Sequence, residues 1–527
     1  MGMYLNPGNV AFEGIISSKY VDKSRLIDYT NRIIGTPQKL VCFTKPRRFG
    51  KSYSAKMLCA YYGKGDDSHG LFNGLKLEKD VYYDKYMNAF NVIYLDITSF
   101  MSDNDVIDEK YNNLLDTIVV KIKKDLFREF NFVNSEDNLT EILLDISQRK
   151  KEKFVFIIDE WDAIFRELPD RVDIQERYID FLRSLFKNGN FTDSVVALAY
   201  MTGILPIKKY GNQSAISDFN EFTMTNCGEL EEYIGFNIDE VVDLIDDSQF
   251  EITELQEWYD GYRSPKGKRI FNPNSIIQAL ERRQLDTYWI NTETYKQLNK
   301  YIEMDFDGLR EDIIKMLGDE KIPVNVNLFQ NDMLIRDKND VYALLIHLGY
   351  LTYDYDDKSV QIPNMEIKHE FKNAISASKK QKLMSIIKNS EELLNATYSM
   401  DGEKVARIIE EVHDIWANPK SYKTEEALRS VVKTAYISAI DDYAKIEELA
   451  SGNGFIDIAY LPKVELSKPA LLIELKWNKS ANGALAQIYE KKYPTIFQNY
   501  RSTVLAVAIN YSEKTKTHTC KIEKICM

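Results

Sequence analysis

The amino-acid sequence predicts an α/β fold built on a parallel sheet for the first part of the chain, up to about residue 235. Four short apolar runs, spaced about 40 to 60 residues apart, alternate there with helical stretches: KLVCFT (39–44), NVIYLDI (91–97), KFVFIIDE (153–160) and SVVALAYMTG (194–203). Such runs are typical of strands that helices cover on both faces. The spacing leaves room for a crossover helix between successive parallel strands.

The composition is that of a folded protein with several domains. A chain of 527 residues predicts about three to four units, and 44% hydrophobic residues exclude general disorder. The five cysteines (Cys42, Cys59, Cys227, Cys520 and Cys526) are few and far apart, which favours a reducing cytoplasm over disulfides or a zinc module. The start shows no signal-peptide pattern, and the longest uncharged stretch, 194–207, is too short to span a bilayer. We therefore expect a cytoplasmic protein without membrane contact.

Changes of pattern divide the chain into four predicted regions: 1–235, 236–300, 301–415 and 416–527. From Asn237 the pattern becomes helical, and Asn237 followed by Glu240 resembles a capping box. We expect residues 236–300 to form a helical lid or appendage.

The third region, 301–415, is expected to be largely helical. Residues 341–364 predict a helix, a glycine turn and two strands around Asp356, Asp357 and Lys358. A helix followed by a β-ribbon is the shape of a winged helix, but a plain packing connector is favoured, because no basic cluster marks a recognition helix.

A candidate phosphate-binding loop follows the first apolar run, in TKPRRFGKSYSAKML (44–58). Such a loop needs inward-facing backbone N–H groups at a helix N-terminus, a lysine for the β- and γ-phosphates and a hydroxyl for Mg²⁺. Gly50, Lys51 and Ser52 fit these roles. By strict pattern the loop is unusual, because Lys45 stands where the first glycine is expected and Pro46, Arg47 and Arg48 fill the interior.

Two acidic residues, Asp159 and Glu160, end the third apolar run, at the strand end where ligands bind in open α/β sheets. Asp159 is the candidate Mg²⁺ ligand, and Glu160 the candidate for orienting or deprotonating the attacking water. The alternative is a pair of solvated carboxylates at a strand end. Thr202, at the end of a later run, is a candidate contact to the γ-phosphate. Arg47 and Arg48 fit either charge neutralisation within one chain or arginine fingers in an oligomer.

The combination of several segments closely resembles the bacterial family of AAA-ATPase-like proteins. The segments are YVDKSRLI (20–27), KPRRFGKS (45–52), IIDEWDAIF (157–165), MTGILPIKKY (201–210) and WYDGY (258–262), and the resemblance covers roughly residues 10–290. It implies a P-loop NTPase core that binds ATP and makes Asp162 a further site candidate. The candidate cofactor-binding residues are then Pro46, Arg47, Arg48, Gly50, Lys51, Ser52, Tyr53, Asp159, Asp162 and Thr202, with Ser52 and Asp159 for the metal and Glu160 for catalysis.

A second group of polar residues lies on two predicted strands near the C-terminus, in GNGFIDIAYLP (452–462) and PALLIELKW (469–477). Side chains alternate along a strand, so Glu474 and Lys476 share one face, and Asp457 on the preceding strand lies within reach. Clustered carboxylates on an apolar sheet predict a bound cation, and oxygen ligands suit Mg²⁺ or Mn²⁺. A Glu–Lys pair on a solvated face is the alternative.

The flanking helices support a site. In the helical stripe of residues 424–440, Glu425 points with the apolar residues toward the core, whereas Glu426 is expected to face outward with Ser430 and Lys433. The predicted helix over 481–493 puts Gln487 and Lys491 one turn apart, able to lean over the sheet.

Together these motifs resemble the PD-(D/E)XK nuclease superfamily, over roughly residues 420–527. The resemblance implies an α/β restriction-endonuclease-like domain in which Asp457, Glu474 and Lys476 form the catalytic set, with Asp457 and Glu474 as metal ligands. By the same resemblance Glu425 is a supporting ligand and Gln487 a substrate contact.

The preferred interpretation is an ATPase coupled to a Mg²⁺- or Mn²⁺-dependent nuclease, acting on nucleic acid in defence or DNA processing. We expect DNA rather than RNA as the partner, and a homo-oligomer fits the arginine-finger interpretation. Net charge is −13 for the chain but +4 over residues 420–527, which allows that region alone to approach a polyanion. The alternative is a nucleotide-dependent signalling or assembly switch whose nuclease-like domain binds a partner without cutting.

Overall fold

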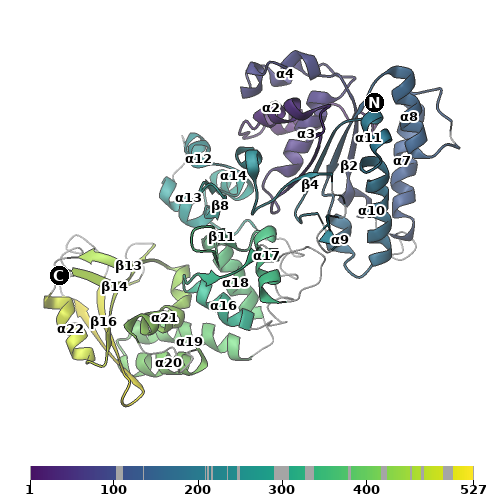
Figure 1. The fold of residues 1–527 in the computed structure, drawn as a ribbon. Helices are drawn as coiled ribbons and strands as arrows, with labels where there is room; N and C mark the ends of the chain where they lie inside the picture. Colours follow the sequence, from purple (N-terminus) through teal and green to yellow (C-terminus); the bar gives the residue numbers. More distant parts are fainter. Residues whose placement is uncertain are drawn as a thin grey trace. The chain divides into compact units, whose positions relative to one another are not determined.

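Two units make up the chain in the computed structural model, and each is described by itself (Figure 1). The first contains residues 1–289 and 323–366, and the second contains residues 290–322 and 367–527. The structure describes residues 2–101, 111–134, 136–207, 209–210, 213–214, 216, 218–233, 235–245, 250–289, 308–326, 337–377, 381–416, 424–451, 454–463, 468–490 and 503–525. The predicted connector, 301–415, is divided between the units, and the predicted four-part division stays a prediction.

The first unit is built on a five-stranded sheet in the order β2-β3-β4-β1-β7, in which every pairing is parallel. Its strands are β1 (Leu40–Thr44), β2 (Asn91–Asp96), β3 (Phe154–Asp159), β4 (Val196–Gly203) and β7 (Asn220–Phe222). The four strands predicted from the apolar runs are confirmed, and so is their parallel arrangement. β7 is a short fifth strand that the sequence analysis does not predict.

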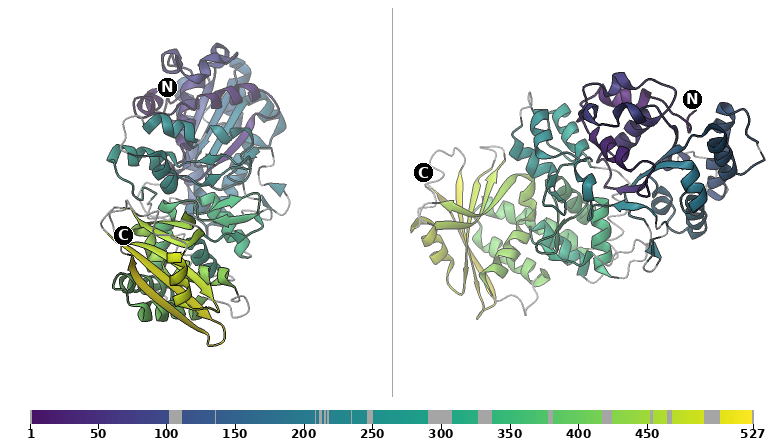
Figure 2. Two further views of the ribbon diagram at one scale, coloured as in Figure 1. Left: turned by 90° about the vertical axis from the view of Figure 1, so that its left-hand side faces the viewer. Right: turned by 45° about the horizontal axis from the view of Figure 1, so that its top comes forward.

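Helices cover both faces of this sheet, as Figures 1 and 2 show. One face packs against α2 (Arg25–Ile33) and α3 (Lys51–Tyr62). The other face forms the main hydrophobic core with α7 (Leu114–Glu129), α8 (Leu139–Lys150), α10 (Val172–Phe186) and α11 (Gly189–Val195). Because both faces are covered, the strands carry continuous apolar runs rather than alternating patterns.

The carboxyl ends of the parallel strands meet at one edge of the sheet. There β1 leads into the loop before α3, β3 ends at Asp159, and β2 ends at Asp96, which lies opposite Asp159 in the strand register. β4 ends at Gly203, where a Cβ atom would lie 2.5 Å from the Asp162 carboxylate and from the Trp161 ring. The backbones at this edge are therefore packed too closely for a side chain at residue 203.

Helices α12 (Ile238–Ile245), α13 (Ile252–Tyr259) and α14 (Pro273–Arg282), with the ribbon β8 (Tyr262–Arg263) and β9 (Arg269–Ile270), follow the sheet. The predicted capping box is confirmed: the Asn237 N–H donates to Glu240 Oε2 (2.9 Å), and the Glu240 N–H donates to Asn237 Oδ1 (3.0 Å). The helical character predicted for this segment is therefore confirmed in its described residues.

The helix and ribbon predicted within 341–364 are α17 (Lys338–Leu348), β11 (Thr352–Asp354) and β12 (Ser359–Gln361). Every residue of α17 from Asp340 to Leu348 is buried, so the helix presents no basic face for a nucleic acid, and the packing interpretation is favoured. Gly349, at the end of α17, lies against the phosphate-binding loop, since a Cβ atom there would be 2.7 Å from that of Pro46.

The second unit contains a mixed five-stranded sheet in the order β13-β14-β15-β16-β17, in which only β15 and β16 pair in parallel. Its strands are β13 (Tyr443–Ser451), β14 (Gly454–Pro462), β15 (Ala470–Trp477), β16 (Val504–Ser512) and β17 (Thr517–Ile525). Its helices are α16 (Leu309–Leu317), most of α18 (Met365–Ala377), α19 (Gln381–Tyr398), α20 (Gly402–Trp416), α21 (Glu425–Ala435) and α22 (Ala481–Glu490). In Figure 1 the sheet lies between α22 and the group formed by α19, α20 and α21. No described helix in either unit is both long and apolar enough to cross a membrane.

One buried carboxylate, that of Glu366, ties the segment after α14 to the start of α18. It is fully buried and accepts hydrogen bonds from the Ser275 hydroxyl and from the N–H groups of Tyr288 (2.7 Å) and Trp289 (2.9 Å). We expect Glu366→Ala to lower the free energy of unfolding of the first unit by about 2–4 kcal/mol, because it leaves these buried donors without an acceptor. Urea denaturation checks this against Glu281→Ala, an exposed position on α14. Equal losses in the two variants would contradict it.

Candidate functional site

The predicted phosphate-binding loop connects β1 to α3 and contains two left-handed residues, Arg48 (φ 66°) and Gly50 (φ 90°). Lys51, the first residue of α3, is buried, and its Nζ donates to the carbonyl of Pro46 (2.8 Å). Burial lowers the Lys51 pKa, although the carboxylates of Glu160 and Asp159 oppose the shift. The Lys51 side chain therefore spans the loop from its end to its start and lies near the carboxylates of Glu160 and Asp159.

The Asp159 carboxylate binds two hydroxyl groups, those of Thr202 and Ser52, that the sequence analysis assigns to the same site. The carboxylate is buried and accepts hydrogen bonds from the hydroxyls of Thr202 and Ser52 and from the Glu160 N–H (3.1 Å). Burial raises the Asp159 pKa. A carboxylate in contact with a serine hydroxyl at the start of a helix is an oxygen donor set that fits Mg²⁺.

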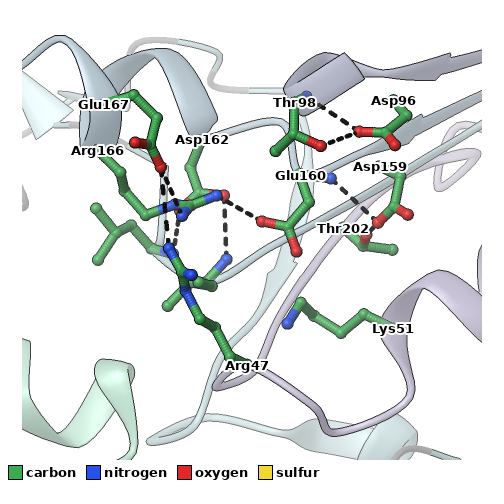
Figure 3. A network of polar contacts seen from close by, with 12 residues as sticks. Arg47, Lys51, Asp96, Thr98, Asp159, Glu160, Asp162, Arg166, Glu167 and Thr202 are labelled. Carbon is green, nitrogen blue, oxygen red and sulfur yellow. Dashed lines mark hydrogen bonds and ion pairs between the residues drawn. The ribbon is translucent and has the colours of Figure 1, made fainter. Parts of the chain in front are cut away.

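Glu160 follows Asp159 in a left-handed conformation (φ 52°) that turns its side chain away from that of Asp159. Figure 3 shows the Glu160 carboxylate between the side chains of Lys51 and Arg166. Burial raises the pKa of Glu160, and the positive charges of Lys51 and Arg166 act against that shift. The two acidic residues at the end of β3 thus have separate surroundings, although they are adjacent in sequence.

Asp162 is fully buried, and both of its carboxylate oxygens are engaged within the protein. Oδ1 accepts from the Ile204 N–H (3.1 Å), and Oδ2 accepts from the Leu205 N–H (2.9 Å) and from Arg166 Nε (2.9 Å). Its contacts fix the chain after β4 to the chain after β3. This arrangement favours a positioning role for Asp162 over direct contact with a ligand.

The remaining loop residues point in different directions. Arg47 Nη2 lies 3.9 Å from Glu167 Oε1, and Arg48 donates to the carbonyl of Tyr288. Both arginines thus have partners within their own unit. Pro46 is buried, whereas Tyr53 is exposed on the first turn of α3.

A cavity of about 440 Å³ adjoins the loop. Gly50, Lys51, Ser52 and Glu160 contribute to its wall near the sheet. The rest of its lining mixes aromatic and apolar residues, among them Phe12, Tyr20, Val21, Tyr233, Phe236, Pro273 and Ile277, with polar and charged ones, among them Ser18, Lys19, Lys23, Asn274, Gln278 and Glu281. A wall that contains both a lysine at a helix N-terminus and several aromatic rings suits a ligand with a charged part and a flat, hydrophobic part.

Sequence reasoning missed two residues at this edge of the sheet. Arg166, in α9 (Ala163–Glu167), binds Glu160 and Asp162, and its spacing of four residues from Asp162 on a helix was the available signal. Asp96 ends β2 next to Asp159 and accepts from the Thr98 N–H (3.0 Å). An acidic residue at the end of an apolar run is the same signal that identified Asp159.

In the second unit, the structure brings the predicted carboxylates together across β14 and β15. Asp457 Oδ2 accepts from the Leu475 N–H (2.8 Å), next to Glu474 on the facing strand. Lys476 Nζ donates to Glu474 Oε1 (2.9 Å), and the Gln487 side chain from α22 donates to the same oxygen. Glu425 is half-buried and close enough to raise the pKa of both Glu474 and Lys476.

Glu474 is the most perturbed carboxylate of this group. It is 1% exposed, and its Oε2 atom has no hydrogen-bond partner among the residues that the structure describes. Burial, followed by the charge of Asp457, raises its pKa to about 7. A buried oxygen without a donor, beside a second carboxylate, fits a divalent cation. Within the described ranges no three His, Cys, Asp or Glu side chains form a metal site by themselves.

The structure adds Arg429 to this group and corrects one prediction. Arg429 lies four residues after Glu425 on α21, and its Nη2 donates to Asp457 Oδ1 (2.9 Å). Glu426 is exposed as predicted, but the prediction that Lys433 also faces outward is wrong. Lys433 is buried, because it forms an ion pair with Glu447 of β13 (3.3 Å), a strand that the sequence analysis did not foresee. Lys491 lies outside the described residues.

Comparison with known proteins identifies one part of the chain. Residues 8–212 match the family described as predicted AAA-ATPase, AAA-ATPase-like. The match covers less than half of the chain and supports an AAA-ATPase-like domain in these residues. The resemblance drawn from the loop and strand motifs is confirmed for this part, whereas the nuclease resemblance stays a prediction.

Two further proteins are similar at low identity. An uncharacterized protein from the vnfD 5′ region of Azotobacter chroococcum mcd 1 is 20% identical over 391 residues, which is 69% of this chain and 70% of that protein. The solved structure of the Aeropyrum pernix ORC2 protein in ADPNP and ADP complexes covers 68% of this chain and 96% of that chain, at 11% identity and a TM-score of 0.31. The likeness to ORC2 is too slight to indicate function.

The raised pKa of Glu474 predicts a pH-dependent stability in the absence of divalent cations. Between the ordinary value of 4.5 and about 7, the folded protein holds a proton that the unfolded chain releases. The stabilising contribution is therefore complete below pH 4.5 and is lost as the pH rises through 7. Glu474→Gln should flatten this part of the profile. Thermal unfolding in EDTA at pH 5 to 8 checks it, with Glu426→Gln as control, and an unchanged slope in Glu474→Gln would refute it.

Proposed function

We propose that the first unit binds and hydrolyses ATP with Mg²⁺. The observation that carries this proposal is that Lys51, Ser52 and Glu160, which come from two different strand ends, line one cavity, while Asp159 holds the Ser52 hydroxyl beside it. Lys51 would leave the Pro46 carbonyl for the β- and γ-phosphates, and Ser52 and Asp159 would hold the Mg²⁺. The bound ion would neutralise charge on the phosphates, while Glu160 orients the attacking water.

The cavity wall supports ATP as the ligand over a bare polyphosphate. The aromatic residues of the wall, among them Phe12, Tyr20, Tyr233 and Phe236, suit a nucleobase, which has two flat faces that pack against rings. Thr202 and Asp162 would act indirectly. The Thr202 hydroxyl binds the Asp159 carboxylate, and Asp162 binds the backbone that follows β4. The partners of Arg47 and Arg48 within their own unit support roles in cis, so homo-oligomer formation is an independent proposal.

The ATP site is tested with Lys51→Ala and Glu160→Gln. Lys51→Ala should weaken binding of a fluorescent ATP analogue by about 100-fold or more, because a buried cation that meets the phosphates is lost. Glu160→Gln should bind ATP with little change and lower kcat by about 100-fold or more.

Lys56→Ala, on the same helix as Lys51, is the matched control for charge. Retention of ATP binding in Lys51→Ala, or full turnover in Glu160→Gln, would overturn the assignment.

For the second unit we propose metal-dependent cleavage of phosphodiester bonds in nucleic acid, with DNA favoured over RNA. The convergence of Asp457, Glu474, Lys476 and Gln487, with Glu425 nearby, supports it. Asp457 and Glu474 would hold Mg²⁺ or Mn²⁺, which supplies Lewis-acid stabilisation of the phosphate. Lys476 would stabilise the developing charge, and Gln487 would contact the substrate or hold Glu474.

A specific observation favours the alternative, a nucleotide-dependent switch whose second unit binds without cutting. Arg429 already occupies one oxygen of Asp457, so the protein supplies a positive charge where a metal ion would bind. A site neutralised in this way can be a stable binding surface without catalysis.

Cleavage assays separate the two functions. With Mn²⁺ and plasmid, single-stranded DNA or RNA, we expect cleavage that falls at least about 100-fold in Glu474→Gln and Asp457→Asn, because the metal ligands are lost. Glu425→Ala should have a smaller effect.

Glu426→Ala, the exposed neighbour of Glu425, is the matched control and should cut normally. Intact substrates in the presence of wild-type protein, together with ATP-dependent partner binding, would favour the switch. Cleavage that persists in Glu474→Gln would refute the proposed site.

A further inference from the structure

A single buried guanidinium, that of Arg166, binds three carboxylates at the edge of the first sheet. Nη2 contacts Glu160 Oε2 (2.5 Å), Nε contacts Asp162 Oδ2 (2.9 Å), and Nη1 contacts Glu167 Oε1 (3.4 Å). The Arg166 side chain is only 3% exposed. Figure 3 shows it beside the side chains of Glu160, Asp162 and Glu167. None of the three carboxylates is Asp159, the proposed metal ligand.

Arg166 is fixed in space through Asp162. The Asp162 carboxylate accepts from the backbone of both Ile204 and Leu205, which directly follow β4. The Trp161 N–H reinforces this link by donating to the Thr202 carbonyl (2.9 Å). Backbone groups at the end of a central strand are among the most rigid parts of a domain. The end of β4 therefore fixes the position of the guanidinium through Asp162. Without this link the long Arg166 side chain could adopt several conformations.

Glu160 depends on this anchor for its direction. Its left-handed backbone points the side chain toward Arg166, and the short ion pair holds one carboxylate oxygen. The second oxygen is left on the side where Lys51 lies (Figure 3). A glutamate has three rotatable side-chain bonds, so without a partner its carboxylate would sample several positions.

We infer that Arg166 is the positioning residue for Glu160: it fixes the carboxylate that orients the attacking water relative to the end of β4. The inference rests on the proposed ATP hydrolysis. Arginine suits the role because its planar fork serves several carboxylates at once, which the single ammonium of a lysine does not do in the same geometry. A catalytic group displaced by about 1 Å can lose about 100-fold in rate.

A third contact links the same guanidinium to the phosphate-binding loop. Glu167, held by Arg166 Nη1, also lies 3.9 Å from Arg47 Nη2. Arg166 thus connects the loop, the end of β3 and the end of β4. The contact between Arg166 and Glu167 is the longest of the three ion pairs, so the role of Arg166 depends mainly on Glu160 and Asp162.

The test is steady-state ATPase kinetics of the full chain with Mg²⁺, together with equilibrium binding of a fluorescent ATP analogue. Arg166→Gln should lower kcat by about 10- to 100-fold and change the ATP dissociation constant by less than about 3-fold. Arg166→Lys keeps the charge without the fork and should lose less. If Arg166→Gln does not fold, Arg166→Lys alone decides, with an expected loss of about 10-fold in kcat at unchanged affinity. Arg183→Gln, a half-exposed arginine on α10, should match wild type.

A double-mutant cycle separates positioning from a merely structural role. In a Glu160→Gln background, Arg166→Gln should cause no further loss in single-turnover rate, because the group that it positions is already gone. Additive losses, or a kcat in Arg166→Gln that equals or exceeds wild type, would overturn the inference while leaving ATP hydrolysis intact. A wild-type protein that binds no ATP would instead refute the proposed function, and the inference would fall with it.

Discussion

The structure of both candidate sites depends on the neutralisation of carboxylates that the fold removes from water. Burying an ionised carboxylate is strongly unfavourable unless a positive charge or several hydrogen-bond donors compensate. In the first unit Arg166 compensates Glu160, Asp162 and Glu167, and in the second unit Arg429 and Lys476 compensate Asp457 and Glu474. Each arginine comes from a helix that packs beside the strand carrying the acid. These cations therefore offset part of the cost of burying the acidic groups.

The phosphate-binding loop tolerates a lysine in place of its expected first glycine because the side chain turns away from the loop. Lys45 is fully buried, and its Nζ contacts Cys227 Sγ (3.0 Å), which in turn donates to the Thr223 carbonyl (3.1 Å). Pro46 then packs against Gly349 at the end of α17. The backbone of the loop is held from behind by these contacts, while Gly50 supplies the left-handed turn that opens α3. Conformational freedom at one glycine is enough when packing fixes the rest.

The sequence was sufficient to predict the features that depend on local pattern. The four long strands of the first sheet, the cap at Asn237, and the acids that end β3 follow from apolar runs and their polar ends. β13 could not be predicted in this way. Its sequence, YAKIEELAS, is rich in helix-forming residues, and only pairing with β14 makes it a strand. That pairing also turned Lys433 inward, so one missed strand produced the error on α21.

The two arginines were missed for a related reason. A charged residue four positions after an acid on a helix usually forms a weak surface pair, and nothing in the sequence says that Arg166 and Arg429 are mostly buried. Burial arises from contacts far along the chain: the backbone after β4 for Arg166, and the hairpin of β13 and β14 for Arg429. Candidate acidic residues can thus be predicted from the ends of strands in the sequence, but the arginines that neutralise them are identified only in the three-dimensional structure.

The placement of the counter-ion distinguishes the two sites chemically. Arg166 binds Glu160 and leaves Asp159 to hydroxyl and backbone donors, so a cation at Asp159 and Ser52 does not compete with it. Arg429 binds Asp457 itself, so a divalent cation in the second unit must share that carboxylate or displace the guanidinium. Glu474 Oε2, which has no hydrogen-bond partner in the described part of the chain, is the oxygen of this group that would remain open to a cation. We therefore expect a cation at the proposed site of the second unit to compete with a counter-ion that the proposed Mg²⁺ site of the first unit does not meet.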